Sequence, residues 1–169
     1  MPDLKKYDRI LDALHQLLED QTLQNISVSD IAKKAGIGKG SIYYYFPSKE
    51  AILDALIERN YEKPLKTAKN LAGQTEISPF TRMAMILQAC RNSSDAFLSQ
   101  DNTVTANAQE SAFLHQKYMN HLIAELKPSL TEIIRQGIAA GEIHFEYPAA
   151  LAEIVLIVLA VKLNNTFLS

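Results

Sequence analysis

The chain has 169 residues, of which 47% are hydrophobic and 21% charged, and its formal net charge is −2. This composition is ordinary for a globular protein and excludes extensive disorder. One cysteine, Cys90, excludes an internal disulfide framework and a cysteine-rich metal site. The longest apolar run, residues 154–161, is too short to cross a bilayer, and the polar N-terminus has no apolar secretion segment. We therefore expect a soluble, cytoplasmic protein without membrane association.

The N-terminal part of the chain predicts three helices. Apolar residues recur with helical spacing over residues 4–20, which predicts the first helix. Ser27 and Asp30 have the spacing of a capping box, which predicts the start of a short second helix, and Gly36 is placed to end it. A third short helix is expected over residues 39–46, where Pro47 stops it. Two short helices around a glycine turn, set on a longer helix, are typical of a helix-turn-helix unit.

The remainder of the chain also has helical periodicity. Ser48 is the expected N-cap of a long helix over residues 49–71, with a kink or break at Pro64. Further helices are expected over residues 79–98, 105–140 with a break at Pro128, and 149–164. No stretch shows strand-like alternation of useful length. The sequence therefore predicts an all-α fold of about eight helices, with a helix-turn-helix domain at residues 1–48 and a helical ligand-binding and dimerisation domain at residues 49–169.

Basic residues are concentrated in the helix-turn-helix unit. The window 31–49 contains four lysines and no acidic residue, although the whole chain is slightly acidic. Two of these lysines, Lys39 and Lys49, stand at the start of predicted helices, where a cation opposes the helix dipole. Two solvated lysines are the simplest interpretation. Lysines beside the N–H groups of a helix start also form an anion site, and DNA supplies phosphates, which favours nucleic-acid binding.

Aromatic and small residues in the third predicted helix favour the same partner. Ile42 and Phe46, four residues apart, are the expected core pair, so the three consecutive tyrosines between them cannot all be buried. One tyrosine is expected to pack against the first helix, and the exposed ones suit contacts to phosphate, sugar or thymine methyl groups. Gly40 removes a side chain where backbone and DNA come close, and Ser41 can donate a hydrogen bond to a phosphate or base.

The segment 27–50 resembles the DNA-binding signature of the TetR family. The resemblance rests on the capping Ser27, the turn glycine Gly36, the opening Lys39-Gly40-Ser41, the pair Ile42-Tyr43, the closing Phe46 and the run Ser48-Lys49-Glu50, and it extends over about residues 4–56. It implies a homodimeric transcriptional repressor that binds a palindromic operator in double-stranded DNA and leaves it when a small effector binds. By position, the resemblance assigns contacts to bases or nearby backbone to Lys39, Gly40, Ser41, Tyr44 and Tyr45, phosphate contacts to Tyr43 and Lys49, and backbone contacts to Val28 and Ser29.

Beyond about residue 60 the resemblance is one of layout only. Members of the TetR family end in two long helices that form a four-helix bundle across the dimer axis, whereas only one such helix, residues 149–164, is predicted here. Either the chain is truncated or its dimer is built differently. This last helix is apolar on nearly every side, which favours a surface shared with a partner over complete burial.

A ligand pocket is expected among the C-terminal helices, because small molecules bind between helices in largely apolar cavities. Apolar residues at helical spacing are more often plain core, which remains the alternative for every candidate. A metal site is not expected, because His115 and His121 are six residues apart and lie on different helix faces. No residue is placed to activate Cys90, so we expect neither an enzyme nor a cofactor. The candidate pocket residues are Met83, Ile86, Leu87, Cys90, Phe113, Tyr118, Met119 and Leu122.

Overall fold

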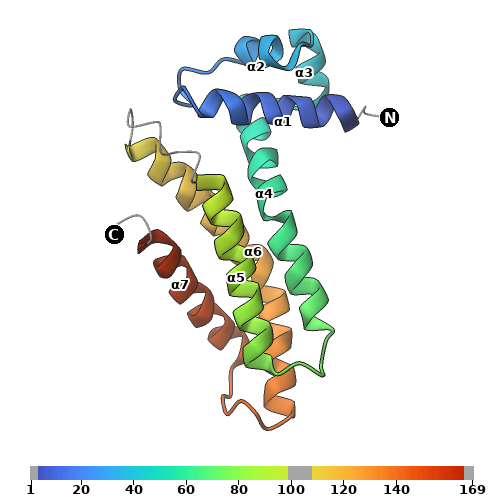
Figure 1. The fold of residues 1–169 in the computed structure, drawn as a ribbon, viewed down its shortest axis with the longest axis vertical. Helices are drawn as coiled ribbons and strands as arrows, with labels where there is room; N and C mark the ends of the chain where they lie inside the picture. The colour runs from blue at the N-terminus through green and yellow to red at the C-terminus, as the bar shows by residue number, and fades with distance from the viewer. Residues whose placement is uncertain (1–3, 99–107, 166–169) are drawn as a thin grey trace. The chain divides into compact units, whose positions relative to one another are not determined.

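The computed structural model describes residues 4–98 and 108–165, and all regular structure in these ranges is helical. This confirms the all-α prediction, with seven helices in the described ranges where about eight were expected (Figure 1). The helices are α1 (Leu4–Leu18), α2 (Val28–Ala35), α3 (Lys39–Tyr45), α4 (Lys49–Ala72), α5 (Pro79–Leu98), α6 (Ala108–Ala139) and α7 (Pro148–Asn165). The expected start of the sixth helix at residue 105 lies outside the described residues.

The lower helix number arises because two helices continue through a proline. Pro64 lies inside α4 and Pro128 inside α6, so the break predicted at Pro128 is absent, and α4 continues through Pro64, where a kink or a break was expected. A proline removes one backbone donor from the helix ladder. Each proline here is followed three residues later by a threonine that donates its hydroxyl to the carbonyl preceding the proline: Thr67 to Lys63 at 3.0 Å and Thr131 to Lys127 at 2.7 Å.

The described residues form two compact units. The first comprises residues 4–60 with 98 and 108–115, and the second comprises residues 61–97 with 116–165. Helices α4, α5 and α6 each contribute residues to both units, so a continuous helix crosses each of the three boundaries along the chain. The domain boundary between residues 48 and 49 that the sequence suggests stays a prediction.

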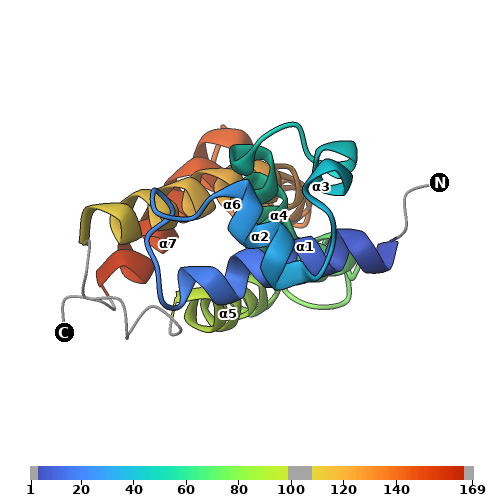
Figure 2. The same ribbon diagram turned by 90° about the horizontal axis from the view of Figure 1, so that it is seen from above.

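In the first unit, α2 contacts both α1 and α3 (Figure 2). Buried residues from all three helices form the core of this unit: Ile10, Leu11 and Leu14 of α1, Ile31 and Ala35 of α2, and Ile42 of α3. The turn after α2 depends on Gly36, whose φ of 64° lies in the left-handed region that other residues rarely adopt. The guanidinium of Arg9 donates to the carbonyls of Ala35 and Gly36 and so fastens this turn to α1.

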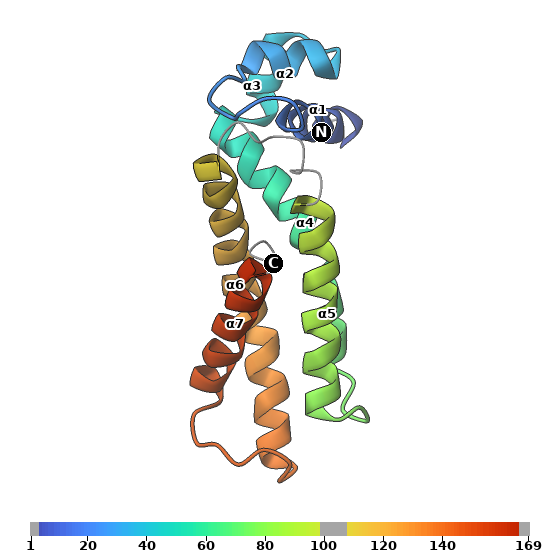
Figure 3. The same ribbon diagram turned by 60° about the vertical axis from the view of Figure 1, so that its left-hand side comes forward.

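In the second unit, α5 and α7 run in the same direction and the second half of α6 runs opposite to both (Figure 3). Its core is apolar and includes Leu71, Ile86, Leu122, Leu126, Ile133 and Leu156, each 3% exposed or less. Gly137 allows a close approach at the end of α6, because a Cβ there would lie 2.7 Å from Ile143 Cδ1 and 2.9 Å from Pro79 Cγ. A side chain at this position would therefore force these elements apart.

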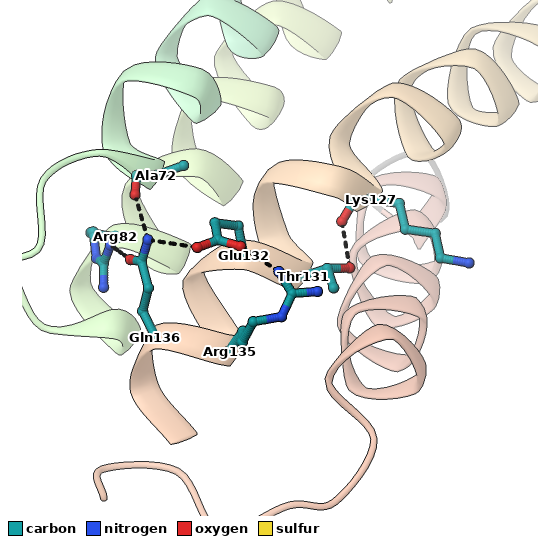
Figure 4. A network of polar contacts seen from close by, with 7 residues as sticks. All are labelled: Ala72, Arg82, Lys127, Thr131, Glu132, Arg135 and Gln136. Carbon is teal, nitrogen blue, oxygen red and sulfur yellow. Dashed lines mark hydrogen bonds and ion pairs between the residues drawn. The ribbon is translucent and has the colours of Figure 1, made fainter. Parts of the chain in front are cut away.

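A buried arginine joins three helices of the second unit (Figure 4). Arg82 of α5 is 2% exposed and donates to Gln136 Oε1 of α6 at 2.6 Å and to the carbonyl of Leu71 of α4 at 3.4 Å. Gln136 in turn donates to the carbonyl of Ala72 and to Glu132 Oε1, each at 3.1 Å. Leu71 and Ala72 end α4, so this network brings a cation and two donors to the negative end of that helix, where they are favourable.

Candidate nucleic-acid interface

The start of α2 has the capping box that the sequence predicts. The Ser27 hydroxyl accepts from the backbone N–H of Asp30 at 3.2 Å, and the Asp30 carboxylate accepts from the Ser27 N–H at 2.8 Å. Hydrogen bonds from the side chain and backbone of Ser27 lower the pKa of Asp30, so this exposed carboxylate is charged at neutral pH. Val28, half-buried, and Ser29, exposed, follow in the first turn, so the box fixes the orientation of two predicted DNA-contacting residues.

Helix α3 buries one side and exposes the other, as predicted. Ile42 and Phe46 are 0% and 4% exposed, which confirms the core pair, and the Phe46 ring lies 4.9 Å from that of Tyr7 in α1. Tyr43 is 50% exposed and Tyr44 69% exposed. Tyr45 is half-buried and meets Tyr44 edge-on at 5.2 Å. The exposed residues of α3 are the predicted contacts Lys39, Gly40, Ser41, Tyr43 and Tyr44.

Within the described residues, nothing requires a glycine at position 40. Apart from its chain neighbours and the helix's own backbone, no heavy atom of these residues lies within 4 Å of the place where a Cβ would stand, and Gly40 is not among their glycines with positive φ. Glycine inside a helix costs about 1 kcal/mol relative to alanine. Gly36, by contrast, is required by its left-handed backbone. The close approach of DNA to Gly40 stays a prediction.

Lys49 has a structural role that sequence reasoning missed. Its ammonium donates to the carbonyls of Leu23 at 2.6 Å and Ile26 at 2.8 Å, both in the loop between α1 and α2. These acceptors offset the unfavourable position of a cation in the first turn of α4. Backbone carbonyls carry no residue-type signal, so nothing in the sequence indicates this tether. The phosphate contact of Lys49 stays a prediction, and the tether accounts for two of the three donors of its ammonium.

The candidate ligand-pocket residues are divided between core and surface. Met83, Ile86, Cys90, Tyr118, Met119 and Leu122 are buried, Leu87 is half-buried, and Phe113 is 56% exposed. Burial raises the pKa of the Cys90 thiol to about 12, so the thiol is protonated at neutral pH. Burial also raises the pKa of Tyr118 to about 12, and its hydroxyl donates to Ser93 Oγ at 3.2 Å. Tyr61, which the sequence did not single out, lies 6.5 Å from the Tyr118 ring and 6.3 Å from that of His121.

Two family profiles match this chain. "Bacterial regulatory proteins, tetR family" matches residues 10–56, and "Tetracyclin repressor-like, C-terminal domain" matches residues 94–168. The chain belongs to the TetR family. This confirms the family that the segment 27–50 suggests, and the second match extends it to the C-terminal part, where the sequence showed a resemblance of layout only.

Individual relatives of this TetR-family chain differ in how much they cover. The regulator EthR of Mycobacterium tuberculosis is 54% identical over 50 residues, which are 30% of this chain and 23% of EthR. The nucleoid occlusion factor SlmA of Shewanella baltica is 26% identical over 147 residues, 80% of this chain and 68% of SlmA. The crystal structure of FadR from Bacillus subtilis in complex with stearoyl-CoA has a TM-score of 0.70 at 22% identity, covering 96% of this chain and 87% of FadR, which shows a shared fold.

In the described residues, no helix is long and apolar enough to cross a membrane.

Proposed function

We propose that this chain is a cytoplasmic, homodimeric transcriptional repressor that binds a palindromic operator and is released from it by a small, largely apolar ligand. The observation that carries the proposal is the exposed face of α3, where the described residues leave open space beside Gly40 and where Lys39, Ser41, Tyr43 and Tyr44 are also exposed. An α-helix fits the major groove, and its N-terminal residues reach the base edges. Ser29 and Val28 at the start of α2, together with Tyr45 and Lys49, complete the proposed contact set.

The proposal is tested by measuring DNA affinity at several salt concentrations. DNA flanking the gene and a selected random-sequence pool serve as probes, with an unrelated duplex as control. Phosphate contacts release counterions, so affinity should fall steeply as salt rises. Two copies related by a two-fold axis should select an inverted repeat. Equal affinity for all duplexes, or no affinity, contradicts the proposal.

Gly40→Ala should have opposite effects on stability and on DNA binding. The site has room for a Cβ, so alanine should stabilise the first unit by up to about 1 kcal/mol through its better helix propensity. The added methyl group should weaken operator binding about tenfold or more, a loss within the range of one disturbed base contact. Urea unfolding and fluorescence anisotropy measure the two effects. Unchanged operator affinity would show that Gly40 does not approach DNA.

Two lysines at helix starts should behave differently when replaced. Lys39 is exposed, so Lys39→Ala should leave stability unchanged and make the salt dependence of DNA binding shallower by about one unit. Lys49→Ala leaves two carbonyls without their donor and should cost about 1–3 kcal/mol of stability, with a smaller change in salt slope. Each variant is the control of the other. An unchanged salt slope in Lys49→Ala would remove Lys49 from the proposed contact set, and an unchanged slope in Lys39→Ala would remove Lys39.

Ligand response and dimerisation are proposed for the second unit. Its helix α7 exposes Ile154, Ile157, Val158 and Val161 at the spacing i, i+3, i+4, i+7, an apolar stripe that a second copy would cover. Helix α4 runs unbroken from Lys49 to Ala72 and belongs to both units, so a ligand that shifts its C-terminal half biases the DNA-binding unit. FadR, which shares this fold, was solved with stearoyl-CoA, whose acyl chain is apolar, and this supports a ligand with a large apolar part. Linkage requires ligand and DNA to weaken each other by the same factor.

A further inference from the structure

The turn between α2 and α3 is fastened to α1 by the side chain of Arg9. Its Nη2 donates to the carbonyl of Ala35, the last residue of α2, and to that of Gly36 at 3.2 Å. The last carbonyls of a helix have no partner within the helix, and a cation near them is favourable. Arg9 therefore supplies hydrogen-bond donors and a positive charge where the end of α2 favours them.

Helix α3 has few local means of fixing its own orientation. It follows a turn formed by residues 36–38, and its N-cap, Gly38, has no side chain that could cap it. The helix has seven residues, of which Ile42 is buried. A helix this short is not stable without tertiary contacts. The orientation of its exposed face therefore depends on the core contact of Ile42 and on what holds the turn before it.

Gly36 allows the guanidinium to come close to this turn. A Cβ at Gly36 would lie 3.0 Å from Arg9 Nη2, so the guanidinium lies beside the place where another residue would carry its side chain. The N–H of Gly36 donates to the carbonyls of Ala32 and Lys33. The turn is therefore held by the backbone of α2 on one side and by Arg9 of α1 on the other.

We propose that Arg9 is a positioning residue for DNA recognition, which holds the α2–α3 turn against α1 and so presents the exposed face of α3 to the base edges in one orientation. The inference rests on the proposed operator binding and adds a residue outside the proposed contact set. Contacts to base edges require side chains placed to within a fraction of an ångström. Attraction to phosphates depends mainly on charge. A loosened turn should therefore reduce sequence discrimination more than it reduces binding to DNA in general.

Arg9 is an exposed residue, and an exposed arginine could instead bind a phosphate itself. The two roles predict different results. A phosphate contact strengthens binding to every duplex alike and contributes about one unit to the salt slope. A positioning contact strengthens binding to the operator and leaves the salt slope unchanged. The geometry favours positioning, because Nη2 carries two hydrogens and donates to two carbonyls of the turn.

The test measures Arg9→Met in the full chain by fluorescence anisotropy at several salt concentrations. The probes are the duplex selected from the random-sequence pool and an unrelated duplex. Affinity for the selected duplex should fall about tenfold, as for one lost base contact, while affinity for the unrelated duplex stays within about twofold. The salt slope should not change on either duplex. Lys6→Met removes an exposed cation of the same helix and should keep the wild-type ratio of the two affinities.

Arg9→Lys keeps the charge and decides the matter if Arg9→Met does not fold, which urea unfolding shows. A compact ammonium lacks the planar fork of arginine, so the ratio of affinities should fall about threefold, whereas a phosphate contact would preserve it. Equal losses on both duplexes, a salt slope shallower by about one unit, or the same loss in Lys6→Met overturns the proposal. A wild-type chain that binds no duplex refutes the proposed function, whereas an Arg9 variant that keeps the wild-type selectivity refutes this inference alone.

Discussion

Ile157→Glu should convert the proposed homodimer into a monomer and lower its affinity for the proposed operator by about 10²–10⁴-fold. The side chain of Ile157 is 59% exposed in the isolated chain and belongs to the apolar stripe of α7 with Ile154, Val158 and Val161. An apolar stripe of four aliphatic side chains on one helix is typical of a surface covered by a partner. A glutamate there would bury an unpaired charge in the interface, which a dimer does not tolerate.

The size of the effect comes from the geometry of a two-site complex. When one subunit is bound to its half-site, the second binds from a high effective concentration, and a monomer loses this advantage. Because Ile157 is exposed in the single chain, the variant should keep the helical content of the wild type. Its unfolding midpoint should equal that of the wild-type chain measured at a concentration where both are monomers. Analytical ultracentrifugation gives the oligomeric state, and fluorescence anisotropy with operator and half-operator DNA gives the affinity.

Phe80→Glu is the matched control for this variant. Phe80, in the first turn of α5, is also 59% exposed but is not part of the α7 stripe, so its replacement should leave both the dimer and operator binding unchanged. A dimer that persists in Ile157→Glu would show that α7 is not the interface. A wild-type chain that is monomeric on its operator would contradict the homodimer itself.

Arg82→Met should cost about 3 kcal/mol of stability in the second unit. Arg82 is 2% exposed, and its guanidinium donates to Gln136 Oε1 and to the carbonyl of Leu71 at the end of α4. Methionine fills much of the same volume, so the expected loss comes mainly from two acceptors left without this donor. Loss of the cation also removes a favourable charge from the C-terminus of α4. Urea unfolding followed by circular dichroism measures the change.

Two further variants separate the buried network from general surface effects. Arg135→Met removes an arginine of the same network whose side chain is 62% exposed and pairs with Glu132, and it should change stability by less than about 0.5 kcal/mol. The double variant Arg82→Met with Gln136→Met should cost less than the sum of the single variants, with a coupling of about 1–2 kcal/mol. Equal costs for Arg82→Met and Arg135→Met would refute the role of Arg82.

Local features of the interface could be predicted from the sequence because each depends on residues within one turn of helix. The two residues of the capping box, Ser27 and Asp30, are three positions apart, and Gly36 ends α2 through its own backbone conformation. The core pair Ile42 and Phe46 is set by the helix period alone. In such cases the partners are close in the chain whatever the tertiary structure, so residue type and spacing are enough.

Prolines show where local rules are insufficient. A break was predicted at Pro128 and a kink or a break at Pro64, yet α4 and α6 continue through both prolines. A missing donor costs a few kcal/mol, and burial of the flanking helix in a core can offset this cost. Leu65, Ala68 and Leu71 follow Pro64 and are all buried. Sequence alone gives the cost of the proline, whereas the gain from packing depends on residues far along the chain.

What the sequence determined by itself is therefore the all-helical fold, the helix-turn-helix and the outward face of α3, since all three follow from local periodicity and capping. Only the tertiary structure decided that Lys49 holds the carbonyls of Leu23 and Ile26, 26 and 23 residues away. It also decided that Arg82 is buried against the end of α4 and that Leu87 faces a groove completed by α7. These contacts join side chains to backbone groups or to distant apolar residues, whose meeting is set by packing and leaves no pattern in the chain.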